Sequence, residues 1–417
     1  MNDKTLNTVV LAGLLHDVGK LEQRVKKDLG VRHEIKSKEF VMNVLFTVWP
    51  VADKFIDKDL LILLVENHHE ASIARIKKSE TPEKTSLMYL LSEADNTSAK
   101  ERGEDSKFSE REFQLYSVFD ILAESEDSNP YPAQAVFYPG YWEKALSVDR
   151  DVFLKPLKEL FRRNDGELDF GKVYNSLYEF LLKYAYLVPD FTLSEYPRTS
   201  LFTHSVFTSA IAGCLYLYHK ENDNLREKDI KNDEIEKFIV YTGALSPVQE
   251  FLFSIEGENP KHIAKILRGR SALLSWTAEA IAYDILSEFS LPVSNLISKQ
   301  GVKFTLLLPN TENAQKVLAE KEAGIIDFLA ERFSMRLNYA SAGVKLCQRD
   351  FKKKPEEPGG KGREAEVDSG LRDKFQELSK TLARNKFCGE IPGNLDGILK
   401  RKYDSLLSMV SKDKNSI

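Results

Sequence analysis

The chain has 417 residues, of which 42 % are hydrophobic and 29 % charged, enough for two or three domains with sizeable cores. Its net charge of −5 argues against a surface that attracts nucleic acid everywhere, although local basic patches remain compatible with it. Three scattered cysteines without a C-x-x-C pair exclude a zinc ribbon and a disulfide scaffold. No signal peptide or apolar run of membrane-spanning length is recognisable, so we expect a cytoplasmic protein with no membrane contact.

The first half of the chain has the apolar spacing of helices. Apolar side chains recur every three or four residues within 1–104, which predicts helices at 5–18, 35–49, 57–69 and 84–101. The same spacing continues within 105–235, at 113–123, 152–162, 173–184 and 203–219, around an aromatic, proline-bearing loop at 130–142. We therefore expect 105–235 to continue the helical domain and to connect it to the next one.

The pattern changes after Glu236. A buried strand is expected at 238–245, and Ser246-Pro247 has the serine N-cap and first-turn proline of a helix start. There follow a helix at 271–289, a hairpin of 295–298 and 302–309, a helix at 311–333 and a strand at 335–346. This β-α-β-β-α-β order predicts a ferredoxin-like palm domain at 236–350. A polar linker at 351–370 and a helical tail at 371–417, with its best helices at 368–384 and 395–410, complete an α+β chain.

The end of the first predicted helix carries an unusual group of polar residues. His16 and Asp17 come directly after seven mostly apolar residues, and Lys20 follows one turn later. An imidazole and a carboxylate at a helix end are half of a ligand set for a divalent metal, and Lys20 could meet a phosphate oxygen. The alternative is an ordinary helix end, with Gly19 as its stop.

Further imidazoles and carboxylates lie near later helices. His68 and His69 end an apolar helix, and Asp95 follows buried helical residues, where it could instead cap the next turn. Because neighbours on a helix diverge by about 100°, one of His68 and His69 should point away from a shared site. His33 and His204 fit a surface, packing or capping role as well as a ligand role.

Mixed imidazole and carboxylate ligands favour one group of metals. They suit manganese, nickel, cobalt or iron better than structural zinc, with magnesium as a further option. Such a site can activate water and neutralise a phosphoryl oxygen, as phosphodiester hydrolysis requires. Sequence spacing alone leaves the number of ions open.

Basic side chains flank the expected metal site. Arg75, Lys100 and Arg102 could follow a single-stranded nucleic-acid backbone, and Arg268 and Arg270 could meet RNA or a neighbouring subunit. The alternative, that each charged run is only a solvated face, stays open.

Five collinear segments resemble the large signature subunit of type III CRISPR effector complexes. They are H-D-V-G-K at 16–20 together with 68–69 and 94–102, S-L-F-T-H at 200–204, G-A-L-S-P-V-Q-E-F at 243–251, L-R-G-R-S at 267–271, and the hairpin at 301–309. The resemblance covers about 9–350 and implies an HD-type domain followed by a palm. It implies a metal-dependent nuclease for single-stranded DNA, with metal ligands His16, Asp17, His68 or His69, and Asp95. It also implies assembly with other type III subunits on a guide RNA and activation by a target RNA.

The palm departs from the family pattern. No G-G-D-D occurs, and the hairpin reads S-K-Q-G at 298–301, without a carboxylate to hold magnesium. Ala244 stands where the family has an aspartate, and the four-cysteine zinc module is missing. We therefore expect no cyclic oligoadenylate synthesis by this chain. It resembles the amino-terminal half of the family, and a separate chain could carry the missing palm.

Together these features lead to one hypothesis and two alternatives. The hypothesis is a subunit of an RNA-guided type III CRISPR interference complex, with an HD single-stranded DNA nuclease site and a degenerate palm. One alternative is a scaffold subunit whose HD site is vestigial. The other is a free-standing HD phosphohydrolase that acts on nucleotides.

Overall fold

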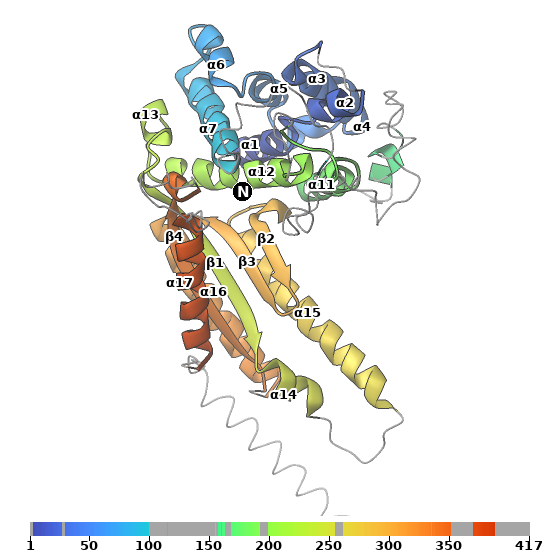
Figure 1. Cartoon of the computed structure of the whole chain (residues 1–417), viewed down its shortest axis with the longest axis vertical. Coiled ribbons are helices and arrows are strands. Elements are labelled where there is room, and N and C mark those ends of the chain that lie inside the picture. The colour runs from blue at the N-terminus through green and yellow to red at the C-terminus, as the bar shows by residue number, and fades with distance from the viewer. Residues whose placement is uncertain are drawn as a thin grey trace, which may run out of the picture. The chain divides into compact units, whose positions relative to one another are not determined.

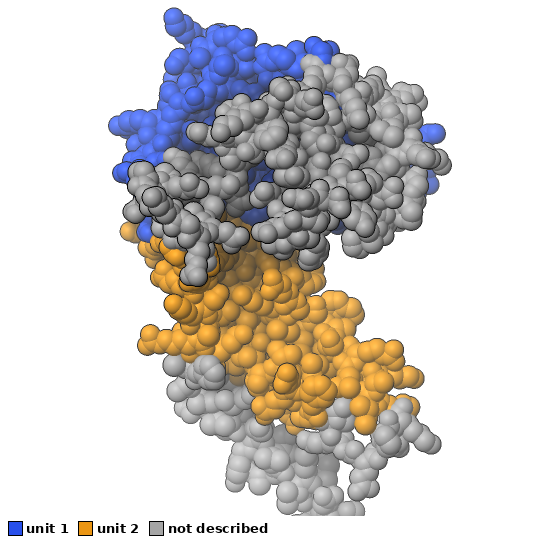
Figure 2. Space-filling view, viewed as in Figure 1, with its two compact units in different colours: residues 1–237, 292–295, 347–370 blue, residues 238–291, 296–346, 371–417 orange. Residues whose placement is uncertain are grey.

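The computed structural model describes residues 3–26, 30–99, 168–191, 199–254, 262–334, 336–351 and 370–387, with a few isolated residues between 115 and 162. The chain divides into two compact units (Figure 2). Unit 1 comprises 1–237, 292–295 and 347–370, and unit 2 comprises 238–291, 296–346 and 371–417. The finer boundary expected at residue 104 stays a prediction.

Unit 1 is helical (Figure 1). Its elements are α1 (Lys4–Leu15), α2 (Gly19–Lys26), α3 (His33–Phe40), the π-helical turn η1 (Val41–Leu45), α4 (Phe46–Val48), η2 (Ala52–Lys54), α5 (Lys58–Glu66), α6 (Glu70–Ile76), α7 (Pro82–Ser98), α11 (Phe170–Ala185), α12 (Leu201–Glu221), α13 (Glu227–Ile230), η4 (Val293–Asn295) and η5 (Gln348–Phe351).

The core of unit 1 is built around α1. Every residue of this helix from Leu6 to Leu15 is buried, because α5, α7 and α12 pack against it. Gly13 permits the closest of these approaches: a Cβ atom there would lie 2.6 Å from the Cα atom of Ser209 on α12. The two helices therefore meet backbone to backbone, and this contact brings the beginning of α12 to the end of α1.

Side-chain caps fix where several of these helices begin. Asp3, Asp57, Thr81 and Ser200 each accept a hydrogen bond from a backbone N–H in the first turn of α1, α5, α7 and α12. Helix α12 is long and apolar enough to cross a membrane by length and composition, but 78 % of its most apolar window is buried inside the protein. It is therefore placed as the core helix of unit 1.

Unit 2 holds the predicted palm. It contains β1 (Glu236–Ser246), α14 (Val248–Phe253), α15 (Ile263–Glu288), β2 (Leu296–Gln300), β3 (Lys303–Pro309), α16 (Glu312–Arg332), β4 (Asn338–Cys347) and α17 (Gly370–Phe387). The four strands form one sheet in the order β2-β3-β1-β4, in which β1 and β2 each pair antiparallel with β3. This order is the ferredoxin-like arrangement that the sequence predicts. The expected α+β fold, with a helical domain followed by a palm and a helix after it, is confirmed.

Some element bounds differ from the sequence prediction. Helix α5 ends at Glu66 rather than 69, and α15 begins at Ile263 rather than 271. The predicted helices at 113–123 and 395–410, the loop at 130–142 and nearly all of the linker at 351–370 lie outside the described residues. Within the predicted helix at 152–162, the described residues are helical.

Candidate metal centre

The first dyad is positioned by the end of α1. His16 follows the last residue of the helix, and its Nδ1 donates a hydrogen bond to the carbonyl oxygen of Gly13 at 2.9 Å. This hydrogen bond leaves Nε2 of His16 without a proton in the neutral ring and directs it inward. Nε2 lies 3.3 Å from Oδ2 of Asp17 and 3.6 Å from Oδ1 of Asp95. The end of α1 thus aims an imidazole nitrogen at two buried carboxylates.

Gly19 has a packing role rather than that of a helix stop. It begins α2, and its backbone is not left-handed. A Cβ atom at this position would overlap the backbone carbonyl of His33, and the Gly19 N–H donates to Oγ of Ser37 on α3 at 2.8 Å. A helix does end at this segment, as the alternative interpretation expects, but the role of Gly19 as its stop is wrong, because α1 already ends at Leu15. The glycine admits the beginning of α3, which carries His33.

Four side chains form a first group of potential ligands. His16, Asp17, Asp95 and His204 offer ligand atoms that all lie within 4.8 Å of one another, and all four residues are buried. Nε2 of His204, on the first turn of α12, lies 3.0 Å from Oδ1 of Asp95 and 3.5 Å from Oδ2 of Asp17. Ser98, one turn beyond Asp95 on α7, contacts the other nitrogen of His204 at 2.9 Å and so fixes the ring.

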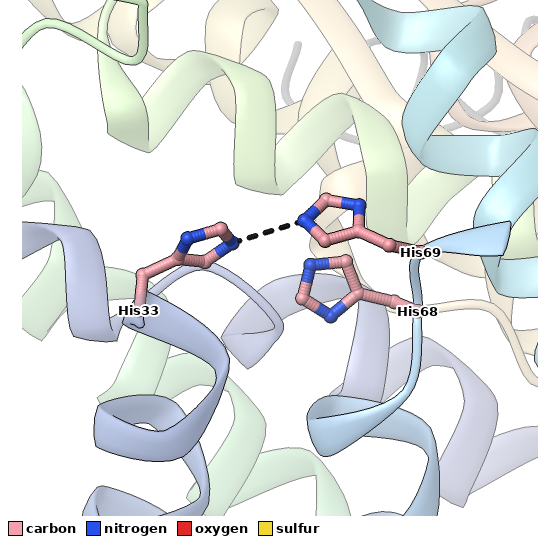
Figure 3. Close-up of side chains that lie close together, drawn as sticks. All are labelled: His33, His68 and His69. Carbon is pink, nitrogen blue, oxygen red and sulfur yellow. Dashed lines mark hydrogen bonds between the residues drawn. The ribbon is translucent and has the colours of Figure 1, made fainter. Parts of the chain in front are cut away.

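Three histidines form a second group (Figure 3). His33 begins α3, and His68 and His69 lie in the turn between α5 and α6. The Nδ1 atom of His68 donates to the carbonyl of Val65 at 2.9 Å, as His16 does to Gly13. Nε2 of His69 and Nε2 of His33 are 3.2 Å apart. The expectation that His68 and His69 diverge is wrong, because both residues follow the helix end and the helical angle does not apply to them.

Asp17 lies between the two groups. Its Oδ2 faces His16 and His204, whereas its Oδ1 lies 3.0 Å from Nε2 of His33 and 3.8 Å from Nε2 of His68. One carboxylate therefore presents a separate oxygen to each set of imidazoles. This is the arrangement in which a carboxylate can be shared by two cations.

Three buried atoms at this centre have no hydrogen-bond partner within the described part of the chain. They are Nε2 of His68 and both carboxylate oxygens of Asp17, although the Asp17 oxygens form ion pairs with Lys20 and His33. Buried polar atoms are nearly always satisfied, and an orphaned atom calls for an explanation such as an ion. Because imidazole nitrogens and carboxylate oxygens surround all three, the donor set fits a divalent cation.

The charges of the centre are strongly coupled. Burial opposes a charge on His16, but the carboxylates of Asp17 and Asp95 outweigh it and raise the pKa of His16 to about 10. Burial, reinforced by the nearby His16, lowers the pKa of His68 to about 3. The pKa of Asp17 and that of Asp95 are both held well below the usual range, because neighbouring cations outweigh the effect of burial. The centre thus keeps its two carboxylates ionised and binds a proton at His16 that a metal would have to displace.

Two further carboxylates support the centre, and the sequence reasoning did not find them. Asp190, 1 % exposed, lies 3.0 Å from Nζ of Lys20, which also pairs with Asp17. Glu34, 4 % exposed, has Oε2 at 3.4 Å from Nδ1 of His33, which leaves Nε2 of that ring facing Asp17. Asp190 comes five residues after the end of α11 at Ala185, and no helical spacing in the sequence marks it. The role of Lys20 as a contact for phosphate stays a prediction, since its ammonium group lies between two carboxylates.

The centre opens toward solvent on one side. The side chain of His69 is 41 % exposed and that of His33 is 18 % exposed. The side chains of His16, Asp17, His68 and His204 are at most 1 % exposed, and that of Asp95 is 11 % exposed. Solvent therefore reaches the centre mainly at the second histidine group.

The predicted nucleic-acid contacts have different surroundings. Arg75 is exposed on α6, close to this open side. Arg268 and Arg270 lie on α15 in unit 2, where Arg270 donates to the carbonyls that end α14 and to that of Ser254. Lys100 and Arg102 lie outside the described residues. All five assignments stay predictions.

The helical unit and its histidine–aspartate centre define an HD-type domain, here followed by a ferredoxin-like palm. The family models agree: the HD domain matches residues 2–100, and the Csm1 subunit domain B matches 237–389. The chain is a relative of Cas10/Csm1, the large signature subunit of type III CRISPR effector complexes, as the sequence motifs predict.

Curated relatives match along nearly the whole chain. The CRISPR system single-strand-specific deoxyribonuclease Cas10/Csm1 (subtype III-A) of Thermococcus onnurineus is 30 % identical over 402 residues, which cover 92 % of this chain and 47 % of the relative. The protein of the same description from Methanocaldococcus jannaschii is 28 % identical over 414 residues, with 90 % and 49 % covered. The chain therefore spans about half the length of the curated relatives it matches.

Solved structures show the same fold. The crystal structure of Csm1 in T. onnurineus has a TM-score of 0.65 at 23 % identity, with 92 % of this chain and 49 % of that chain covered. A Csm1–Csm4 subcomplex in the type III-A CRISPR-Csm interference complex has a TM-score of 0.65 at 25 % identity, with 94 % and 50 % covered.

Proposed function

We propose that the helical unit is a metal-dependent phosphodiesterase that cuts single-stranded DNA as part of a type III CRISPR effector complex. The observation that carries this proposal is the buried Asp17, whose two oxygens face two separate sets of imidazoles. The names of the relatives support the substrate, since they describe single-strand-specific deoxyribonucleases.

The chain offers ligands for two divalent cations. His16, Asp95 and His204 would hold one, His33, His68 and His69 the other, and Asp17 both. Manganese, nickel, cobalt or iron suit this donor set, with magnesium as a further option. Such cations supply a nucleophile from water and neutralise charge on a phosphoryl oxygen.

The protein's own residues prepare the centre for this chemistry. The carbonyls of Gly13 and Val65 orient His16 and His68, and Glu34 orients His33 in the same way. Lys20, held between Asp17 and Asp190, offsets the negative charge of the carboxylates. The burial of most ligands excludes bulk water, and this strengthens every electrostatic contact at the centre.

For the palm we propose a docking role without cyclic oligoadenylate synthesis. The β2–β3 hairpin turns at Gly301, which has a φ of 61°, and the neighbouring Lys299 and Gln300 supply no carboxylate. Csm1–Csm4 cassettes of similar fold are described in complex with one ATP and with cA4. We propose that this chain binds other type III subunits, guide RNA and target RNA through the assembled complex.

A nuclease assay tests the proposal. The purified chain should cut a single-stranded oligodeoxynucleotide with manganese or nickel, and His16→Ala/Asp17→Ala should abolish the cutting. His262→Ala removes an exposed histidine of unit 2 and should leave it unchanged. Equal cutting by the wild type and the double variant would contradict the assignment. Retention of metal without cutting would favour a scaffold with a vestigial site. Phosphate release from deoxynucleotides would favour a free-standing phosphohydrolase.

A further inference from the structure

Two arginines meet at one buried hydroxyl beside the open side of the metal centre. Ser72, on the first turn of α6, is 3 % exposed. Its Oγ accepts a hydrogen bond from Nη2 of Arg32 at 3.2 Å and from Nη2 of Arg75 at 3.0 Å. Two guanidinium groups so close together repel each other, and their arrangement suits an anion that both could contact.

We infer that Arg32 and Arg75, joined at Ser72, form a phosphate-binding site that holds the backbone of the substrate strand next to the His33–His69 opening. This inference rests on the proposed function and concerns how the metal centre binds its substrate. The two arginines would bind the DNA backbone, and the buried metal ligands would carry out the hydrolysis.

The position of the two arginines follows from the elements that carry the exposed histidines. Arg32 directly precedes His33 at the beginning of α3. Ser72 lies three residues beyond His69, which is the N-cap residue of α6, and the Ser72 N–H donates to the His69 carbonyl at 2.8 Å. The same two helix ends therefore place the imidazoles at the opening and the arginines at its rim.

The charge balance at the rim is positive. Arg32 pairs with Glu34 at 2.6 Å, so this carboxylate offsets one of the two guanidinium charges. Among the described residues, Arg75 donates hydrogen bonds to neutral partners, Ser72 and the carbonyl of Ala71. One carboxylate against two guanidinium groups leaves a net charge of +1, which one phosphodiester would neutralise. The nearby Glu66 does not alter this balance, because Lys38 pairs with it at 2.9 Å.

The donors of the arginines remain sufficient for such a ligand. A guanidinium group has five N–H donors in a planar fork, and a phosphate accepts two of them in parallel. Arg32 uses both hydrogens of Nη2 in its hydrogen bonds with described residues, which leaves Nε and Nη1 as separate donors. Arg75 uses Nε and one hydrogen of Nη2, which leaves Nη1 and the other Nη2 hydrogen as a parallel pair. The side chain of Arg32 is 49 % exposed, and Arg75 is exposed as well.

This site predicts that substrate length matters. A small diester such as bis(p-nitrophenyl) phosphate could reach the buried ligands without touching the rim. An oligonucleotide has further phosphates, and one of them would contact Arg32 and Arg75 while another lies at the metal centre. The arginines should therefore strengthen the binding of oligonucleotides more than that of the small diester.

The test is the affinity of the full chain for a 20-nucleotide oligodeoxythymidine, measured by fluorescence anisotropy in EDTA at several salt concentrations. We expect Arg32→Gln/Arg75→Gln to raise Kd by about tenfold and to lower the salt dependence by about 0.7, the value for the loss of one phosphate contact on a single strand. Arg32→Lys/Arg75→Lys should keep the salt dependence but lose part of the affinity, because lysine keeps the charge without the fork. Arg349→Gln, which removes an exposed arginine paired with Glu234, should behave as the wild type.

The small diester separates this inference from the proposed function. With manganese, Arg75→Gln, whose hydrogen bonds go to Ser72 and the carbonyl of Ala71, should require a higher concentration of oligonucleotide for half-maximal cutting, and the ratio of oligonucleotide cleavage to bis(p-nitrophenyl) phosphate hydrolysis should fall. A Kd and salt dependence equal to those of the wild type would overturn the phosphate site, whether or not the protein is a nuclease. If the wild type cuts neither substrate, the proposed nuclease fails, and the affinity in EDTA still decides the role of the two arginines.

Discussion

The charge of Asp17 should stabilise both the metal-free protein and its metal-loaded form, and Asp17→Asn separates the two effects. Asparagine has nearly the same volume as aspartate, so the substitution leaves no cavity. It removes the negative charge that faces Lys20 and four imidazoles at the centre. The variant therefore tests the electrostatics of the site rather than its packing.

The expected cost in the absence of metal follows from the neighbours of Asp17. Removing one partner of a buried ion pair typically costs about 3–5 kcal/mol. Lys20 would still have Asp190 at 3.0 Å, and His16 would still have Asp95 at 3.6 Å. We therefore expect a loss near the lower limit, about 3 kcal/mol in the free energy of unfolding.

Urea unfolding with EDTA or with manganese measures both effects. In EDTA the variant should be less stable by about that amount. A manganese concentration of about one hundred times Kd should stabilise the wild type by about 2.7 kcal/mol for each bound ion and should leave Asp17→Asn unchanged. Asp53→Asn, at a 71 % exposed aspartate paired with Lys58, is the matched control, and we expect a change below about 1 kcal/mol. An Asp17→Asn variant as stable as the wild type in EDTA, or equally stabilised by manganese, would refute the reasoning.

Three further variants test other parts of the structure. His68→Ala should lower the manganese content measured by mass spectrometry from two ions to one for each chain, and two retained ions would contradict the second ligand group. Burial lowers the pKa of His219 to about 4, so its neutral form contributes stability above pH 6.5 that is lost as the pH falls toward 4. His219→Gln should reduce that loss, by at most about 3 kcal/mol, in unfolding curves between pH 7 and 4, and an unchanged pH dependence would exclude this cause. The fully buried Lys237 donates hydrogen bonds to Gln348 and to two backbone carbonyls of α13. Lys237→Met should therefore lower the free energy of unfolding by about 3 kcal/mol. An unchanged free energy of unfolding would show that these carbonyls find other partners.

Local patterns in the sequence predicted most of the described elements. The three- and four-residue apolar spacing located the helices of unit 1, and the alternation of strands and helices after Glu236 predicted the palm and its sheet. The end of α5 was misplaced by three residues, because His68 and His69 follow an apolar run that has no stop signal of its own. This small error caused the wrong expectation that one of the two histidines points away.

The candidate site was only partly predictable. Asp17 and Asp95 follow apolar runs, and a carboxylate at a buried position is recognisable from the sequence alone. His33 and His204 were left open because each lies in a segment that suits a surface or a cap equally well. Glu34 and Asp190 were missed, since their role is to orient or neutralise other residues and has no spacing of its own.

By itself the sequence determined which side chains could bind a metal and that helices would present them, because residue chemistry and apolar periodicity are local properties of the chain. Only the tertiary structure decided which of them meet. His204 reaches Asp95 across 108 intervening residues because α12 packs on α1 and α7, with Gly13 admitting the closest approach to α1. His33 reaches Asp17 because Gly19 leaves room for α3. Distances between ligands on separate helices depend on how those helices pack, and packing is a property of the whole core rather than of any one segment.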